Sequence, residues 1–327
     1  MPTIPSSMVI PQTMASGMPS PQRMGLGIRT RPNSFTPLRR GISLITGAMG
    51  SGKSYLIESL ARCLRINLDL RPNTSANPLC DTYPFIDNGT AIGPSGSPVF
   101  LNWDDNETSI CALVKTLVEQ AKSPHTRLYD TIAWDTIDQM LPIAKIIVAR
   151  RANKPNFRDL IGWTGWDLLG ETIYNDIIQP LRDSGYGLIM TAHIITSTAF
   201  ADEKATGQFE DLRISASIRK IITPPCNMIC RVEPVETTER RKIEQQYQTP
   251  QGPQKRLVDV DTPIKKVLLL TKDSRLPNFL KITYSSKFPN PLALPENSPW
   301  DFLEAAYSQA AKDSGVDVPV PTAPLKV

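Results

Sequence analysis

The chain has 327 residues, 40% of them hydrophobic, and its 36 Lys and Arg residues slightly outnumber its 32 Asp and Glu residues. This length suits one large α/β domain or two small ones, and a net charge of +4 is too small to indicate nucleic-acid binding by itself. No apolar run approaches the roughly 20 residues of a membrane span, and the first residues lack the pattern of a signal peptide. We therefore expect a cytoplasmic protein without a membrane partner.

The N-terminal segment is basic and lacks hydrophobic periodicity. It is rich in Met, Pro, Ser and Thr, has no acidic residue before Lys53, and contains Arg23, Arg29, Arg31, Arg39 and Arg40. This composition predicts a disordered basic tail over residues 1–40. Such a tail is either a solvated terminus without function or an arm that lies along phosphates, and considered alone it favours the first interpretation.

The first half of the ordered sequence alternates strand and helix patterns. A buried strand is expected over 41–46, a helix over 53–66, a strand over 99–103, a helix over 108–122 and a strand over 128–134. Residues 67–98 contain several prolines and an Asn-Gly pair, which predict an insertion with one hairpin. The alternation is typical of an α/β fold with a mainly parallel sheet between helices.

The second half predicts a helix over 166–183 that stops before Gly185, and a buried strand over 187–193. Residues 194–225 are polar and suggest a long mobile loop. Strands at 228–232 and 265–271, which flank the turn-rich segment 249–254, predict a long antiparallel hairpin. Ser298 with Pro299 predicts the start of a helix that ends near Lys312. The expected domain covers residues 41–288, and 289–327 form a C-terminal extension with a loose end.

The strongest motif is G-x-x-x-x-G-K-S, which lies between the first strand and the first helix. Glycines allow such a loop to wrap so that successive N–H groups point at phosphate oxygens. Lys53 is expected to neutralise the β- and γ-phosphates of ATP, and the Ser54 hydroxyl to ligate Mg²⁺. The predicted nucleotide-binding residues are Gly47, Ala48, Met49, Gly50, Ser51, Gly52, Lys53, Ser54 and Tyr55.

A second element of the same chemistry follows downstream. The apolar segment 131–134 ends in Asp135, the Walker B pattern of a carboxylate that anchors Mg²⁺ at the end of a strand. Strands also end in Asp for solubility, but the phosphate loop upstream favours the functional interpretation. Asp138 is close in sequence and is expected to begin the next helix.

The order of the phosphate loop and the segments 131–138, 187–193 and 270–277 resembles phage-encoded nucleotide-binding proteins with a RecA-type core, over about residues 41–285. Some members of that group are single-strand-annealing recombinases. The resemblance implies that His193 senses the γ-phosphate, and that Lys272 and Arg275 are basic fingers directed at a neighbour's nucleotide. A His that is satisfied at a sheet end, and two solvated surface residues, are the competing interpretations.

The resemblance also implies a water-activating acid after the second strand. RecA-like enzymes place a glutamate there, whereas the matching segment 100–104 offers Asp104, with Glu107 close behind. The shorter side chain predicts slow hydrolysis, unless Glu107 substitutes for it.

These observations predict a protein that binds and hydrolyses ATP with Mg²⁺ and acts with single-stranded DNA in phage recombination or replication. A homo-oligomeric ring or filament, a single-strand-binding protein as partner, and the host cytoplasm as location follow from the resemblance. Two alternatives stay open: a nucleotide-gated binding protein with little turnover, and a small-molecule or nucleotide kinase.

Overall fold

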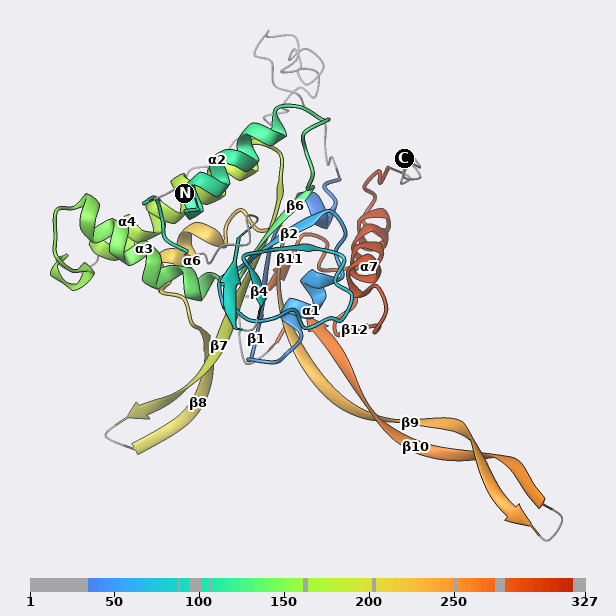
Figure 1. The fold of residues 1–327 in the computed structure, drawn as a ribbon. Helices are drawn as coiled ribbons and strands as arrows, with labels where there is room; N and C mark the ends of the chain where they lie inside the picture. The colour runs from blue at the N-terminus through green and yellow to red at the C-terminus, as the bar shows by residue number, and fades with distance from the viewer. Residues whose placement is uncertain are drawn as a thin grey trace, which may run out of the picture.

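A computed structural model describes residues 35–319, apart from residue 88 and the segments 94–100, 106–107, 161–163, 202–203, 250–251 and 274–279. A twisted sheet has the strand order β12-β10-β9-β1-β7-β6-β2-β3, and helices lie on both of its faces (Figure 1). Adjacent strands from β9 to β3 pair in parallel. The predicted α/β fold with a mainly parallel sheet is therefore confirmed.

The strands of this sheet, together with those that pair with it, are β1 (Ile42–Gly47), β2 (Cys63–Asn67), β3 (Asp81–Tyr83), β6 (Thr131–Asp135), β7 (Gly187–Ala201), β8 (Lys204–Leu212), β9 (Met228–Thr249), β10 (Gly252–Leu270), β11 (Lys281–Ile282) and β12 (Leu292–Leu294). Strands β4 (Phe85–Asp87) and β5 (Thr90–Ile92) form the hairpin predicted in the insertion.

The helices are α1 (Lys53–Glu58), α2 (Ile110–Ala121), α3 (Ile137–Arg151), α4 (Thr164–Ile173), a π-helical turn (Tyr174–Ile178), α5 (Gln179–Asp183), α6 (Ala216–Ile222) and α7 (Pro299–Asp313). Gly185 has a φ of +77° directly after α5, so the predicted helix stop is confirmed. No helix within the described ranges is long and apolar enough to span a bilayer.

Successive side chains of the strands alternate between the two faces of the sheet, and a hydrophobic core lies on each face. Leu44, Trp134 and Met190 pack with α2 to α6, whereas Ile45 and Ile189 pack with α1 and α7. Successive side chains of a strand point to opposite faces, so a strand buried on both sides is apolar throughout.

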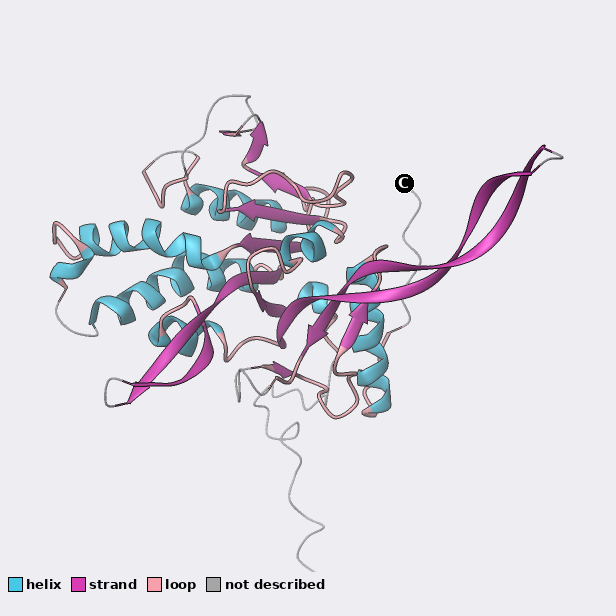
Figure 2. Cartoon of the chain, turned by 90° about the horizontal axis from the view of Figure 1, so that it is seen from below, coloured by secondary structure: helices cyan, strands magenta, loops and turns pink. Residues whose placement is uncertain are grey.

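Two hairpins project from the sheet, and both views show them leaving its body (Figures 1 and 2). The predicted long hairpin is confirmed: β9 and β10 pair from Arg231 with Leu270 out to Thr249 with Gly252, so the strands extend beyond the expected 228–232 and 265–271. The predicted loop over 194–225 was wrong: β7 continues to Ala201 and pairs with β8, and α6 follows with Ser215 as its N-cap. A projecting hairpin has little core to bury, so its sequence lacks the hydrophobic pattern of a strand.

Three further expectations were wrong at their boundaries. The first helix ends at Glu58, because Arg62 adopts a positive φ and Cys63–Asn67 is strand β2. Residues 101–103 form no strand, and β3 from the insertion occupies the sheet edge beside β2 instead. The last part of the predicted tail, residues 35–40, is packed: Leu38 is fully buried, and Arg39 pairs with Glu304. Residues 1–34 lie outside the described residues.

Candidate nucleotide site

The carboxyl ends of β1, β2, β6 and β7 meet at one edge of the sheet. Strand β7 lies between β1 and β6, and the register sets Gly47 beside His193 and Asn67 beside Asp135. The loops that follow these strands therefore converge, which is where open α/β sheets bind ligands.

The phosphate loop connects β1 to α1. Three of its glycines stand at positions where a side chain would be strained or would collide with a neighbour. Gly50 and Gly52 have φ values of +75° and +99°, a region that favours glycine. A Cβ on Gly47 would lie 2.6 Å from the carbonyl oxygen of Val232, so a larger residue would collide with β9. The backbone thus adopts the tight wrap that the motif predicts.

Lys53 is held inside this loop. Its amine donates hydrogen bonds to the carbonyl oxygens of Gly47 at 3.0 Å and Ala48 at 2.8 Å, and the residue is only 5% exposed. Burial lowers the pKa of Lys53, although the nearby charges of Asp135 and Asp138 oppose that change. The loop therefore fixes a desolvated amine where phosphates are expected.

Asp135 lies at the centre of a buried polar cluster and is 1% exposed. Its carboxylate accepts hydrogen bonds from the Ser54 hydroxyl at 2.8 Å, the Thr191 hydroxyl at 2.5 Å and Arg65 Nε at 2.9 Å. The adjacent oxygens of Ser54 and Asp135 fit Mg²⁺, which usually takes one or two protein oxygens and completes its shell with phosphates and water. No cluster of three or more His, Cys, Asp or Glu among the described residues forms a separate metal site.

Arg65 was missed by the sequence analysis. It is 1% exposed and forms ion pairs at 2.8 Å with both Asp135 and Glu58. Glu58 in turn accepts hydrogen bonds from the backbone N–H groups of Thr74 and Ser75. The sequence signal that could have identified it is an arginine within an otherwise apolar segment. A buried charge requires a partner of opposite charge, so such an arginine indicates a buried carboxylate nearby. The expected helix over 53–66 concealed it.

His193 and Asp138 form a buried pair beside this cluster. The distance from His193 Nδ1 to Asp138 Oδ2 is 2.9 Å, and the backbone N–H of His193 donates to Oδ1 at 3.3 Å. Burial alone would raise the pKa of Asp138, but hydrogen bonds and the charge of His193 outweigh it and lower that pKa. Asp138 lies in the first turn of α3, as expected, and it also orients the imidazole.

The phosphate pocket lies between the loop and these strand ends, and Asp69 is its acidic wall. Asp69 accepts a hydrogen bond from the Thr136 hydroxyl at 3.2 Å, and its N–H donates to the Asp135 carbonyl at 3.3 Å. It lies just after Leu68 in the loop that leaves β2, and it was missed because that strand was predicted as helix. The pocket is lined by Met49, Gly50, Ser51, Gly52, Lys53, Ser54, Tyr55, Arg65, Asp69, Arg71, Pro72, Thr74, Thr136 and His193.

Asp104 lies elsewhere, and its predicted catalytic position was wrong. It forms ion pairs with Arg150 at 3.7 Å and Arg151 at 3.4 Å, at the carboxyl end of α3. Helix α3 starts beside Asp135 and has 15 residues, about 20 Å of helix, and Asp104 is not among the residues that line the phosphate pocket. The predicted strand that was to position Asp104 does not form in residues 101–103, and Glu107 lies outside the described residues.

The two predicted basic fingers lie beyond the phosphate pocket of their own chain. Lys272 is exposed after the end of β10, where its N–H donates to Asn290 Oδ1 at 3.1 Å. Strand β9 separates β10 from β1, so Lys272 does not line the pocket. Arg275 lies outside the described residues, and its role stays a prediction.

One family model matches the chain over residues 41–263, the AAA_24 model, which is described as an AAA domain. The matched region includes the phosphate loop, Asp135 and His193, and it ends within β10. No curated protein matches the chain.

Proposed function

The chain belongs to the AAA_24 family of AAA domains, which makes it a P-loop ATPase, and we propose that it couples ATP hydrolysis to the binding of single-stranded DNA. Recombination or replication of a phage genome is the process that we infer, on the resemblance to phage-encoded RecA-like proteins described above.

The observation that supports this coupling is the continuity between the site and the hairpins. Strand β7 contains Thr191 and His193, which contact Asp135 and Asp138, and then runs on as the first strand of a projecting hairpin. Strand β9 pairs with β1 up to Arg231 and continues into the long hairpin. A rearrangement of the phosphate pocket would therefore act on both hairpins through the backbone of two strands.

An ion-pair cluster joins the bases of the two hairpins. Arg231 on β9 is 6% exposed, donates to Glu210 on β8 at 3.0 Å, and lies 3.3 Å from Asp273. The hairpins are thus joined to each other where they leave the sheet, and from there they point in different directions (Figures 1 and 2).

Single-stranded DNA is the ligand that we favour, because its phosphates attract basic side chains. The sequence of the long hairpin contributes Arg240, Arg241, Lys242, Lys255 and Arg256. The basic residues 1–34 would add contacts of the same kind.

Each group of the pocket has a task in ATP hydrolysis. Lys53 would bind the β- and γ-phosphates, and Ser54 and Asp135 would hold Mg²⁺, which when bound would neutralise charge on the phosphate oxygens. Asp69, in place of Asp104, orients the attacking water, and His193 presents Nε2 to the γ-phosphate because Asp138 occupies Nδ1.

A homo-oligomer, ring or filament, would explain Lys272 and Arg275 as fingers that reach the nucleotide of a neighbour. Arg275→Ala should then keep ATP binding and lose turnover by roughly 10³ to 10⁵. Mixing it with Lys53→Ala subunits should restore part of the activity, since some mixed sites contain both groups. Demonstrably mixed but inactive oligomers would place Arg275 in its own chain or outside catalysis.

The decisive experiment measures phosphate release with and without single-stranded DNA. A matched variant replaces residues 238–263 by Asn-Gly, which joins Thr237 to Ile264, two residues that already pair. We expect stimulation of the parent, and basal hydrolysis without stimulation in the variant. Release that requires a small-molecule acceptor would indicate a kinase, and tight ATP binding with little release a nucleotide-gated binding protein; either would overturn the proposal.

A further inference from the structure

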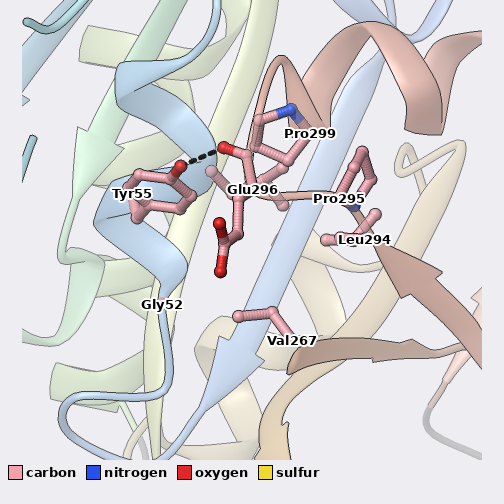
Figure 3. Close-up of a pocket in the computed structure, with 8 residues that line it drawn as sticks. Gly52, Tyr55, Val267, Leu294, Pro295, Glu296 and Pro299 are labelled. Atoms are coloured by element: carbon pink, nitrogen blue, oxygen red, sulfur yellow. Dashed lines mark hydrogen bonds between the residues drawn. The ribbon is translucent and has the colours of Figure 1, made fainter. Parts of the chain in front are cut away.

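A second pocket borders the phosphate loop on the side of α7, and Figure 3 shows it in close-up. It shares Gly52 and Tyr55 with the phosphate pocket, so the two pockets are neighbours along the loop. Its lining comes from α1, from β10 and β12, and from the turn before α7: Gly52, Tyr55, Leu56, Val267, Leu294, Pro295, Glu296 and Pro299.

The two pockets differ in chemistry. The phosphate pocket contains Lys53, Arg65 and Asp69, whereas the walls of the second pocket are apolar apart from Tyr55 and Glu296. A nucleoside triphosphate has the same division, since its charge is at the phosphate end and its uncharged base has flat faces that pack against apolar side chains. If the γ-phosphate lies beside Lys53 and His193, the nucleoside lies at the opposite end of the triphosphate, away from His193.

The walls of the second pocket are held by the core. Strand β12 pairs with β10 so that Leu294 lies beside Val267, and Trp300 at the start of α7 is fully buried. The backbone N–H of Trp300 donates to the Ser59 hydroxyl at 3.2 Å, which joins α7 to the end of α1. The walls of the pocket are therefore anchored in the packed core.

Glu296 is the acidic group of this pocket. The Tyr55 hydroxyl donates a hydrogen bond to the Glu296 carbonyl oxygen, and the Glu296 carboxylate points into the pocket toward the side of Gly52 and Val267 (Figure 3). A carboxylate accepts hydrogen bonds from ribose hydroxyls in other nucleotide sites. The sugar is bonded directly to the phosphates, so it is the part of the nucleotide nearest the loop.

We propose that this second pocket binds the nucleoside of ATP, with the ribose hydroxyls donating to Glu296 and the base against Val267, Leu294 and Pro295. The inference rests on the proposed ATPase function and deepens it. These residues follow the matched AAA domain, which ends at residue 263, so the C-terminal segment would determine which nucleotide is preferred.

The test compares ATP with inorganic tripolyphosphate, because both use the phosphate loop and only ATP has a nucleoside. Titrations with Mg²⁺ should show that the parent binds ATP more tightly. Val267→Trp, which fills the pocket, should weaken ATP binding by about tenfold or more and leave tripolyphosphate within about twofold. Val260→Trp, the same substitution at an exposed position of β10 outside both pockets, is the matched control and should bind both ligands like the parent.

Glu296→Gln tests the sugar contact. It should weaken ATP roughly three- to tenfold, since a charged acceptor becomes a neutral one, and leave 2′,3′-dideoxy-ATP unchanged. Equal affinity of the parent for ATP and tripolyphosphate, or a parallel loss of both ligands in Val267→Trp, would overturn the nucleoside pocket. A parent that binds neither ligand would overturn the ATPase function itself.

Discussion

Two groups of acidic residues show how differently carboxylates of one chain can be used. Asp135 is 1% exposed and is bonded to Ser54, Thr191 and Arg65 at the carboxyl edge of the sheet. Asp104, a surface residue, pairs with Arg150 and Arg151 at the far end of α3. Both were predicted as strand-ending acids of one ATP site, and only Asp135 lies there.

This difference shows that an acidic residue belongs to the nucleotide site because it lies at the carboxyl edge of the sheet. Being an aspartate after a predicted strand is not sufficient. Exposed ion pairs contribute about 0–1 kcal/mol, so the surroundings of Asp104 do not constrain its chemistry. A buried carboxylate must instead be matched by donors, and removing one partner of a buried ion pair costs about 3–5 kcal/mol. Asp135 and its neighbours Asp69 and Asp138 are therefore the acids whose replacement should change function.

The largest effect is expected at Lys53, the cation inside the loop. Lys53→Ala should abolish detectable Mg-ATP binding and turnover, because the desolvated amine held by Gly47 and Ala48 is lost. Isothermal titration measures the affinity, and Lys122→Ala, at an exposed pair with Glu119, is the matched control. Undiminished affinity in Lys53→Ala would reject the phosphate pocket.

Replacing Asp69 and Asp104 in parallel tests the comparison directly. Asp69→Asn should lower turnover by roughly 10²- to 10⁴-fold at nearly unchanged ATP affinity, the range for loss of a general base. Asp104→Asn should hydrolyse ATP like the parent. Steady-state phosphate release at saturating ATP distinguishes the two, and a reversed result would return the water-activating role to Asp104.

Asp135→Asn should have a smaller effect on turnover, about 10²-fold, since the amide retains an oxygen beside Ser54 but loses the charge that attracts Mg²⁺. The defect should be partly relieved at high Mg²⁺ concentration, because the loss is one of metal affinity. A Mg²⁺ titration of turnover measures this shift. A variant as active as the parent at low Mg²⁺ would show that Asp135 does not anchor the ion.

The phosphate loop and Asp135 could be predicted from sequence because each is a local pattern flanked by apolar strand residues. Asp69 and Arg65 could not, since recognising them required the end of α1 at Glu58, and the helical reading of 53–66 hid strand β2. The projecting hairpin after His193 was missed for a related reason. Its strands pair through the backbone and bury little, so no hydrophobic period marks them.

The smallest expected effect concerns stability at the His193 and Asp138 pair. The pKa of Asp138 in the native protein lies below its ordinary value of 3.8, so the unfolded chain takes up the proton first as the pH falls. The stabilising contribution is therefore complete above pH 4 to 5 and is lost as the pH falls through the native pKa.

Asp138→Asn should remove that contribution, roughly 1.5–3 kcal/mol for a hydrogen bond to a charged group. Urea denaturation from pH 7 to pH 3 should show the variant less stable at neutral pH, with the difference from the parent shrinking toward pH 3. Asp104→Asn should follow the parent at every pH, because its surface ion pairs contribute little to folding. A difference in the free energy of unfolding between Asp138→Asn and the parent that stays constant across this range would contradict the prediction. The pair would then contribute through packing alone, and the buried Asp138 would be no more pH-sensitive than the surface residue Asp104.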